Sequence, residues 1–196
     1  MIIVDVEASG IDPQKNSLLS IGAVDFENPE RIFYEECRIW DGAQISDEAL
    51  LVNGFSREEI VDKNKKTEAD IVISFLHWVE QVKEHTLAGQ NPSFDLGFIH
   101  FACLRNKINF TLAYRTIDLH SVCFAHMMAR KIEPLVEKGR SGIDSDFIMK
   151  YVGIPAEPKP HIALNGAIWE TEAFGRLLKN EILLEKFKDY VIPWLA

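Results

Sequence analysis

The amino-acid sequence predicts an α/β fold in which a mixed five-stranded sheet is flanked by helices. Three strand-like segments come first, at 2–8, 17–26 and 31–39, and turn signals separate them, which is typical of an antiparallel meander. Helical patterns then alternate with two further strand-like segments, at 86–90 and 114–119. Because alternating strands and helices favour parallel pairing, we expect a three-stranded meander extended by two parallel strands.

Helices are expected where apolar residues recur every three or four positions and where start or stop residues flank the run. Ser46 and Ser56 are suitable N-caps for two short helices, and Gly153 followed by Pro155 is a typical stop for another. The expected helices cover 46–51, 56–60, 67–83, a segment from 93, a segment ending near 130, 144–152 and 161–178.

The composition fits one domain without a membrane span. With 196 residues and 47% hydrophobic content, the chain can enclose a single core, so we expect one domain over 1–196. The tail, 181–196, is partly apolar, and we expect it to dock on the body or on a partner chain in a homodimer. No apolar run reaches the length of a membrane span, and the first strand follows Met1 without a leader.

Charge and cysteine content narrow the class further. The net charge of −9 argues against a general polycation-type nucleic-acid binder, although a local basic groove or bound metal ions would offset the repulsion. Arg130, Lys131, Lys138 and Arg140 are candidates for phosphate contacts, and a solvated surface is the simpler interpretation. Three Cys without a CxxC pair favour a reducing compartment, so we expect a cytoplasmic protein.

The first strand contains two acidic residues, Asp5 and Glu7, in an otherwise apolar run. Side chains alternate along a strand, so both carboxylates point to the same face, about 6 to 7 Å apart along the backbone. Two carboxylates side by side in a low-dielectric setting repel each other unless a cation lies between them. A hard divalent metal ion with oxygen ligands is therefore expected here.

Two further residues, Asp95 and His161, are expected at the starts of helices, where functional side chains are often found. Asp95 follows the junction of a strand and a helix, and ligands of such sheets gather at the carboxyl ends of strands. Taken alone, Asp95 would be an acid favoured by the helix dipole. His161 is expected at the start of the last long helix, where the dipole disfavours the charged imidazole and suits a neutral general base. A partly buried capping residue is the alternative role for His161.

Together these residues resemble the motifs of the DEDDh family of 3'-to-5' exonucleases, which includes proofreading subunits of polymerases, oligoribonuclease and ribonuclease T. The segment 5–10 resembles the first motif, Asp-x-Glu-x-Thr/Ser-Gly, and 91–95 resembles the second, Asn-x-x-Phe-Asp. The segments 53–56 and 116–118 are similar to weaker landmarks. His161 and Ala163 match the third motif, His-x-Ala-x-x-Asp, and the order of all motifs makes the resemblance specific.

The resemblance implies a ribonuclease H-like fold and a hydrolase that uses two divalent ions, Mg or Mn, to release nucleoside 5'-monophosphates from single-stranded 3' ends. It implies that the acids bind or support the ions and that His161 deprotonates the attacking water. It also implies that the backbone of Ala8, Ser9 and Gly10 and the side chains of Asn91 and Phe94 contact the terminal nucleotide. The residues assigned to metal or catalysis by this resemblance are Asp5, Glu7, Asp95 and His161.

The sequence departs from the third motif because Gly166 replaces its final acid. Loss of this ligand is expected to lower both metal affinity and rate. Side chains of a helix lean toward its N-terminus, so we hypothesise that Glu170 reaches back over Gly166 and supplies a carboxylate, directly or through water. An ordinary exposed helix acid is the alternative for Glu170.

Several functions compete on these residues. The leading one is a metal-dependent exonuclease on single-stranded DNA or RNA, weakened by Gly166. The main alternative is a catalytically impaired relative that binds nucleic acid or a partner protein without cleavage. An engineered Gly166 that traps substrate and a phosphatase for small substrates are two further alternatives, and the second motif argues against the phosphatase.

Overall fold

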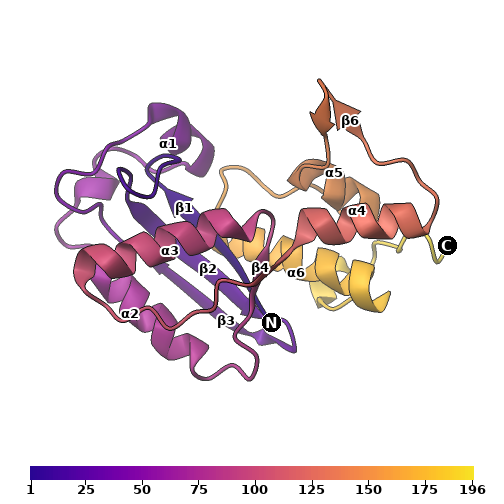
Figure 1. The fold of residues 1–196 in the computed structure, drawn as a ribbon, viewed down its shortest axis with the longest axis horizontal. Coiled ribbons are helices and arrows are strands. Elements are labelled where there is room, and N and C mark those ends of the chain that lie inside the picture. Colours follow the sequence, from indigo (N-terminus) through magenta and orange to yellow (C-terminus); the bar gives the residue numbers. More distant parts are fainter.

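The chain folds around one mixed sheet whose strand order is β3-β2-β1-β4-β5, as Figure 1 shows for the computed structural model, which describes all 196 residues. β1 pairs antiparallel with β2, and β2 with β3, while β4 and β5 continue the sheet in parallel. The strands are β1 (Ile2–Ala8), β2 (Leu18–Asp25), β3 (Asn28–Glu36), β4 (Leu87–Gly89) and β5 (Thr116–Asp118). The predicted fold class is thus confirmed.

Six α-helices flank the sheet, and two single 3-10 turns complete the chain. The helices are α1 (Asp47–Asn53), α2 (Glu68–Val79), α3 (Pro92–Asn106), α4 (Leu119–Ala129), α5 (Ser145–Val152) and α6 (Ala163–Lys179), and the turns are η1 (Glu59–Val61) and η2 (Glu185–Phe187). Ser46 and Thr67 cap α1 and α2 with their side chains, and Gly153 ends α5 in the left-handed conformation. No helix has both the length and the apolar character needed to cross a membrane.

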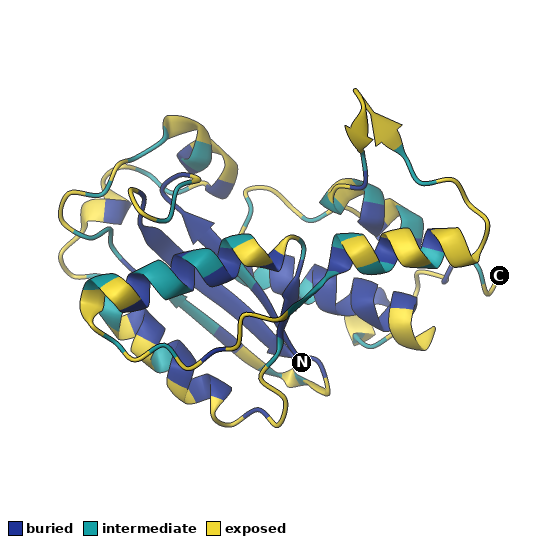
Figure 2. Cartoon of the chain, viewed as in Figure 1, coloured by how far each residue is buried: buried dark blue, intermediate teal, exposed yellow.

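The two faces of the sheet are covered by different helices. Ile2, Val4 and Val6 of β1 pack into a cluster with α2 and α3, whereas Ile3 between them packs into a cluster with α4, α5 and α6. This alternation follows from the period of two along a strand. β1, β2 and β4 are correspondingly mostly dark blue in Figure 2, which marks them as buried, whereas the edge strand β3 is partly exposed.

Helix α6 is buried on almost all sides because it lies between the sheet and the C-terminal tail. Its first turn approaches β2 so closely that a Cβ on Gly22 would overlap the backbone of Ala163. At its other end the fully buried Arg176 pairs with Glu172 at 2.7 Å and donates to carbonyls of Val152, Phe187, Tyr190 and Val191. The last 16 residues thereby contact the same helix that borders β1.

Several elements differ from the predictions. The segment 56–60, expected as a helix, forms only the 3-10 turn η1, and α2 and β3 end earlier than expected. β3 begins at Asn28, so the turn after β2 is confined to about Phe26 and Glu27, because Asn28 pairs with Asp25. α6 begins at Ala163 with Ile162 as its N-cap, which leaves His161 outside the helix. A short hairpin, β6 (Val136–Glu137) and β7 (Arg140–Ser141), was not predicted, since strands of two residues have no periodicity to detect.

Candidate active site

β1 places Asp5 and Glu7 on the face of the sheet that α6 covers. Asp5 pairs in register with Gly22, the residue beneath the start of α6, and it is the one residue of β1 that is not buried. Glu7 lies two positions further on, opposite Ser20. The two carboxylates therefore point toward the first turn of α6 and the segment before it, as the strand periodicity predicts.

Asp95 reaches β1 from the first turn of α3. The parallel pairing of β1 with β4 ends after Ile3, so the N–H of Val6 has no partner strand on that side. Asp95 Oδ1 accepts a hydrogen bond from this N–H at 3.0 Å, and the residue is buried. A helix from the opposite face of the sheet thus brings a third acid to the edge of β1, beside Asp5.

Gly166 faces Asp5 from α6. A Cβ on residue 166 would overlap Asp5 Oδ2, so the Asp5 carboxylate fills the space that a larger residue would need. The sequence departs from the exonuclease motif at the same position where the structure has no room for a side chain in the present rotamer of Asp5.

Glu170 lies one turn further along α6 and is 6% exposed, which contradicts its interpretation as an exposed helix acid. Its Oε2 atom is buried without a hydrogen-bond partner and would lie 3.1 Å from a Cβ on Gly89 in β4. Burial and the nearby Asp95 raise the pKa of Glu170 well above its usual range, and the backbone N–H of Gln90 opposes the shift. A buried carboxylate without a partner is costly, so this group needs a proton or a cation.

His161 lies in the extended segment before α6, and it faces a carboxylate rather than the N–H groups of the helix. Its Nδ1 is 3.2 Å from Oε2 of Glu157, whose side chain is 8% exposed, while the His161 side chain is 34% exposed. Its backbone N–H bonds the carbonyl of Val52 at 3.1 Å, which fixes the segment against α1. Sequence analysis missed Glu157, because only its spacing of four residues from His161, across a Pro-rich segment, hinted at a contact.

The acids of this site interact electrostatically. Burial raises the pKa of Asp5 well above its usual range, and Asp95, Glu170, Glu7 and Glu157 add to the shift in that order. Burial, then Glu157 and Asp95, raise the pKa of Glu7 to about 8. Burial raises the pKa of Asp95 to about 7, although backbone N–H groups oppose it. The cluster therefore holds more negative charge than its surroundings neutralise.

These five acids, called the acidic cluster below, fit divalent ions by donor chemistry. Carboxylate oxygens are the ligands that Mg²⁺ and Mn²⁺ prefer, and the unpartnered Oε2 of Glu170 is a free donor of that kind. In the described side-chain arrangement, no three His, Cys, Asp or Glu residues converge in a geometry that could hold a metal ion. Metal binding would thus require rotation of at least one carboxylate.

The residues predicted to contact a nucleotide differ in their exposure to solvent. Ser9 is fully buried, and its hydroxyl donates to Gln44 O at 2.8 Å and accepts from Ser17 N–H at 2.8 Å. Ser9 thus supports the end of β1 from inside rather than at the surface. Its neighbours Ala8 and Gly10 are also buried, whereas Asn91 is left-handed with φ 55° at the start of α3 and Phe94 is half-buried.

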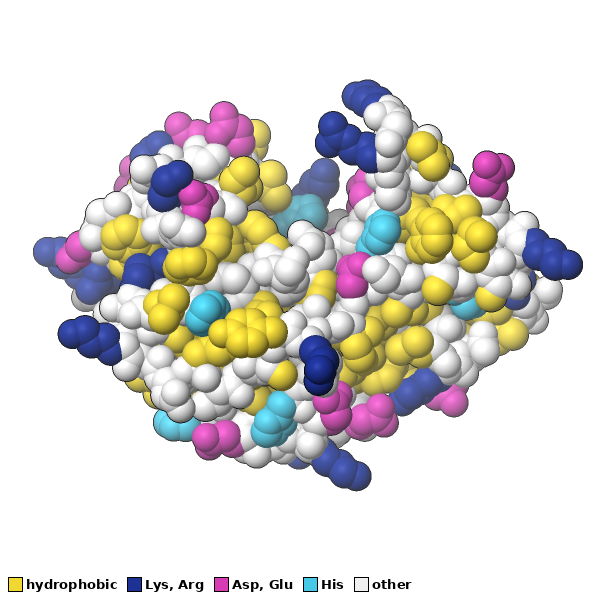
Figure 3. All heavy atoms as spheres, in the orientation of Figure 1, with side chains coloured by type: hydrophobic (Ala, Val, Ile, Leu, Met, Phe, Trp, Pro, Cys, Tyr) yellow, Lys and Arg dark blue, Asp and Glu magenta, His cyan; other side chains and the backbone are white.

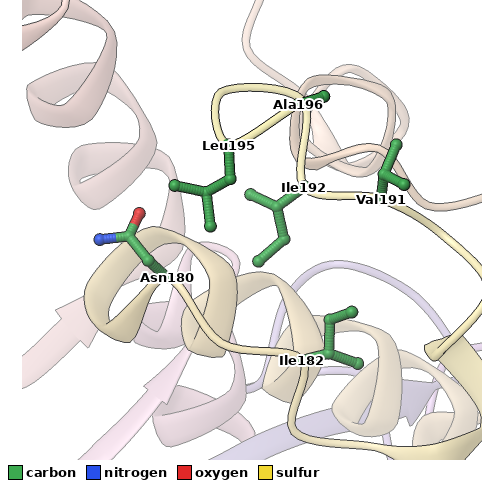
Figure 4. A pocket seen from close by; sticks show the side chains of 6 residues that line it. All are labelled: Asn180, Ile182, Val191, Ile192, Leu195 and Ala196. Carbon is green, nitrogen blue, oxygen red and sulfur yellow. The ribbon is translucent and has the colours of Figure 1, made fainter.

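Two pockets show where ligands can approach. One is lined by Leu51, Val52, Lys159, Pro160 and His161, so the imidazole opens onto the surface. The other is apolar and lies at the tail, as Figure 4 shows; its lining residues are Asn180, Ile182, Val191, Ile192, Leu195 and Ala196, none of which belongs to the acidic cluster. Of these two, only the first includes a residue of the candidate active site. His161 also borders an adjacent pocket, which it lines together with Tyr34, Glu36 and Asn53.

The structure thus brings two acids of β1 next to an acid of α3, with a His in the segment before α6. The chain belongs to the exonuclease family (RNase T), whose sequence profile matches residues 2–165. This is the family that the motifs predict.

Solved structures of low sequence identity share the fold. The nuclease domain of 3'hExo, a DEDDh family member bound to rAMP, has a TM-score of 0.70 and 14% identity, with 94% of each chain covered. Exonuclease I of E. coli has a TM-score of 0.73 and 20% identity over 92% of this chain and 40% of that one.

A relative found by sequence similarity matches a smaller part of the chain. The PolC-type DNA polymerase III of Thermotoga maritima is 24% identical over 98 residues, which are 50% of this chain and 7% of that protein. The chain thus spans a small fraction of this relative and less than half of exonuclease I.

Proposed function

We propose that this protein is a metal-dependent 3'-to-5' exonuclease that hydrolyses phosphodiester bonds at the 3' ends of single-stranded DNA or RNA and releases nucleoside 5'-monophosphates. The observation that supports this most is the position of Asp95, which bonds the N–H of Val6 next to Asp5, with Glu7 two positions further on the same face of β1. His161 lies in the segment before α6, beside Glu157. Family membership and the oligonucleotide bound to exonuclease I in one solved structure add support.

Two divalent ions, Mg or Mn, are the cofactors of this proposal. Asp5, Glu7 and Asp95 would hold them, and Glu170 would supply the carboxylate that Gly166 does not. When bound, the ions neutralise the phosphate and stabilise the attacking and leaving oxygens. The raised pKa values of Glu7 and Asp95 are consistent with this role, because they mark carboxylates that lack a counter-charge.

His161 is the general base of the proposal, and Glu157 orients it. Glu157 Oε2, 3.2 Å from Nδ1 of His161, favours the tautomer with its proton on Nδ1, in which Nε2 is the nitrogen with a free lone pair. The Nε2 atom accepts the proton of the attacking water. With 34% of its side chain exposed, His161 can exchange that proton with solvent after each cycle.

The test is degradation of single-stranded DNA and RNA of about 20 nucleotides in Mn²⁺, with the label at the 5' end in one set and at the 3' end in another. We expect a ladder shortened from the 3' end and 5'-mononucleotides as products, which His161→Ala abolishes. Internal cleavage, or equal activity of His161→Ala, would contradict the proposal.

A second candidate function rests on Gly166 and on the lack of three converging ligands: a protein that binds single-stranded nucleic acid or a partner protein without cleaving. Binding of the same oligonucleotides without release of mononucleotides would favour it. Under either function, we propose one domain over 1–196, a cytoplasmic location and, through the tail 181–196, a homodimer as an assembly to test by light scattering.

A further inference from the structure

We propose that the β6–β7 hairpin is a contact surface for the phosphodiester backbone of the strand whose 3' end enters the acidic cluster, with Lys138 and Arg140 as the contacting cations. This inference rests on the proposed function, because it assigns the path of the same substrate. It concerns residues that lie outside the exonuclease motifs.

The hairpin is joined at its base to the elements that form the site. His120 Nε2, at the start of α4, is 2.7 Å from Ser141 Oγ in β7. Gln90, between β4 and the start of α3, donates from Nε2 to the carbonyl of Ile143 at 3.5 Å. The hairpin is therefore fixed at the carboxyl ends of β4 and β5, where Asp95 also lies.

The surface view supports this placement. In Figure 1, the hairpin stands apart from the helices next to α5. In the same orientation, Figure 3 shows Lys and Arg side chains gathered on the hairpin, beside a hollow that separates it from the part of the molecule around α1. A strand that enters this hollow passes the hairpin.

The two cations are free to bind a phosphate. Both are exposed, and neither is part of any ion pair in the structure. Lys138 with φ 49° and Gly139 with φ 78° make a tight left-handed turn, which is typical of a two-residue hairpin loop. Glu137 is the one acid of the hairpin. It is the strand partner of Arg140, but the two side chains form no ion pair.

The net charge of the protein explains why cations would be needed along the path of a nucleic-acid strand. The chain has a net charge of −9 and an acidic cluster, so a polyanion is repelled wherever metal ions do not neutralise it. Screening limits each charge to about 8 Å at physiological ionic strength, so cations must lie beside the strand to hold it. Lys159 lines the pocket of His161 and is a further cation close to that residue.

A matched control exists in the same part of the chain. Arg130 and Lys131 follow α4, and ten residues at 1.5 Å each separate Arg130 from His120 by about 15 Å. The Arg130 guanidinium lies over the Trp194 ring of the tail, 5.7 Å from its centre. This pair has the same charge as the hairpin pair but lies at the far end of α4.

The experiment compares Lys138→Glu/Arg140→Glu with Arg130→Glu/Lys131→Glu. Binding of a fluorescein-labelled single-stranded oligonucleotide of about 20 nucleotides is measured by anisotropy in Ca²⁺ at several KCl concentrations. We expect the hairpin variant to lose about tenfold or more in affinity and its slope of log K against log salt to fall by about 1.4, for two lost contacts. The control variant keeps the wild-type affinity within about twofold.

Kinetics add a second readout in Mn²⁺. The KM of the hairpin variant should rise more for strands of about 20 nucleotides than for dinucleotides, because a short substrate does not reach the hairpin. Lys138→Gln/Arg140→Gln, with a smaller charge change, should give an intermediate effect. Equal loss in the hairpin and control variants, or no loss in either, overturns the inference.

The binding assay does not require cleavage, so the two proposals fail separately. If the protein binds the oligonucleotide through the hairpin but does not hydrolyse it in Mn²⁺, the proposed exonuclease activity is refuted and the hairpin contact is retained. If the protein hydrolyses the oligonucleotide and the hairpin variant binds like the wild type, the hairpin contact is refuted and the exonuclease activity is retained.

Discussion

The carboxylate of Asp5 lies in the space where a Cβ on Gly166 would be. A glycine at this point of α6 costs about 1 kcal/mol of helix stability relative to alanine, and it allows the carboxylate of β1 to rest directly against the helix backbone. Position 166 and the Asp5 rotamer are thus coupled, and any substitution at 166 must move Asp5.

Gly166→Asp should restore a metal ligand and destabilise the protein without metal. The new side chain displaces the Asp5 carboxylate and adds a negative charge beside Asp5, whose pKa burial and four neighbouring acids already raise. We expect a lower melting temperature in EDTA, and about tenfold tighter Mn²⁺ binding by calorimetry.

Gly166→Ala is the control for this substitution, because it introduces the same overlap without a carboxylate. It should lose stability in EDTA and show no gain in Mn²⁺ affinity. If both variants bind Mn²⁺ like the unaltered protein, position 166 is not part of the metal site.

Glu170→Gln and Glu172→Gln should have opposite effects on stability. Glu170 has a buried oxygen without a partner, so removing its charge should stabilise the metal-free protein by about 1 to 3 kcal/mol at pH 8. Glu172 pairs with the fully buried Arg176, so the same change there should cost about 3 kcal/mol. Urea unfolding in EDTA measures both.

Mn²⁺ affinity tests whether Glu170 is a metal ligand or only a buried acid. Glu170→Gln should weaken Mn²⁺ binding about tenfold, whereas Glu172→Gln should leave it within about twofold. Unchanged Mn²⁺ affinity of Glu170→Gln would remove Glu170 from the metal site while leaving the stability prediction intact.

Glu157→Gln should lower kcat about 10- to 100-fold with little change in KM, because it disturbs the orientation of the His161 base rather than substrate binding. The ¹⁵N shifts of His161 should at the same time lose the preference for a proton on Nδ1. Glu157→Asp should recover part of the rate, and the exposed Glu133→Gln should match the unaltered protein. A tautomer that does not respond would rule out an orienting role.

Stability without metal should fall as pH rises. The folded pKa of Glu7 is about 8 against 4.5 in its ordinary state, and that of Asp95 is about 7 against 3.8. Between these limits the folded state holds more protons than the unfolded state, so stability is greatest below pH 4.5 for these groups and is lost toward pH 8. Each group contributes at most about 1.4 kcal/mol per pH unit.

Mn²⁺ should cancel this loss, because a bound cation replaces the protons. Unfolding in EDTA and in Mn²⁺ at pH 5.5 and pH 8 measures the effect. A melting temperature in EDTA that does not fall over this range would contradict the raised pKa values.

The sheet and the acids of β1 could be predicted because both depend on local periodicity. Asp5 and Glu7 stand on one face whenever this segment is a strand, and the predicted strand is present. The link from Asp95 to Val6 could not be predicted, since it requires β4 to end early and leave an N–H of β1 free. Contacts across 89 residues leave no trace in local pattern.

The prediction for His161 shows a different limit. His161 was predicted to begin the last long helix, but α6 begins two residues later, at Ala163. The imidazole therefore faces Glu157 and not the N-terminus of the helix. Helix boundaries depend on the cap and on packing against Gly22, neither of which the apolar pattern encodes. The hypothesis that Glu170 reaches toward Gly166 came from helix geometry alone, whereas its burial against Gly89 of β4 depends on how the helix packs on the sheet.

Helix α6 joins the acidic cluster to the end of the chain. Gly166 and Arg176 are ten residues apart on this helix, or about 15 Å, and the Arg176 guanidinium bonds three carbonyls of the tail. The helix therefore behaves as a rigid rod with the acids at one end and the tail at the other. Removal of the tail would take away three of the carbonyl acceptors of a fully buried cation and leave Arg176 with Glu172 and the carbonyl of Val152. The end of the chain therefore contributes to the stability of the same helix that borders the acids of β1.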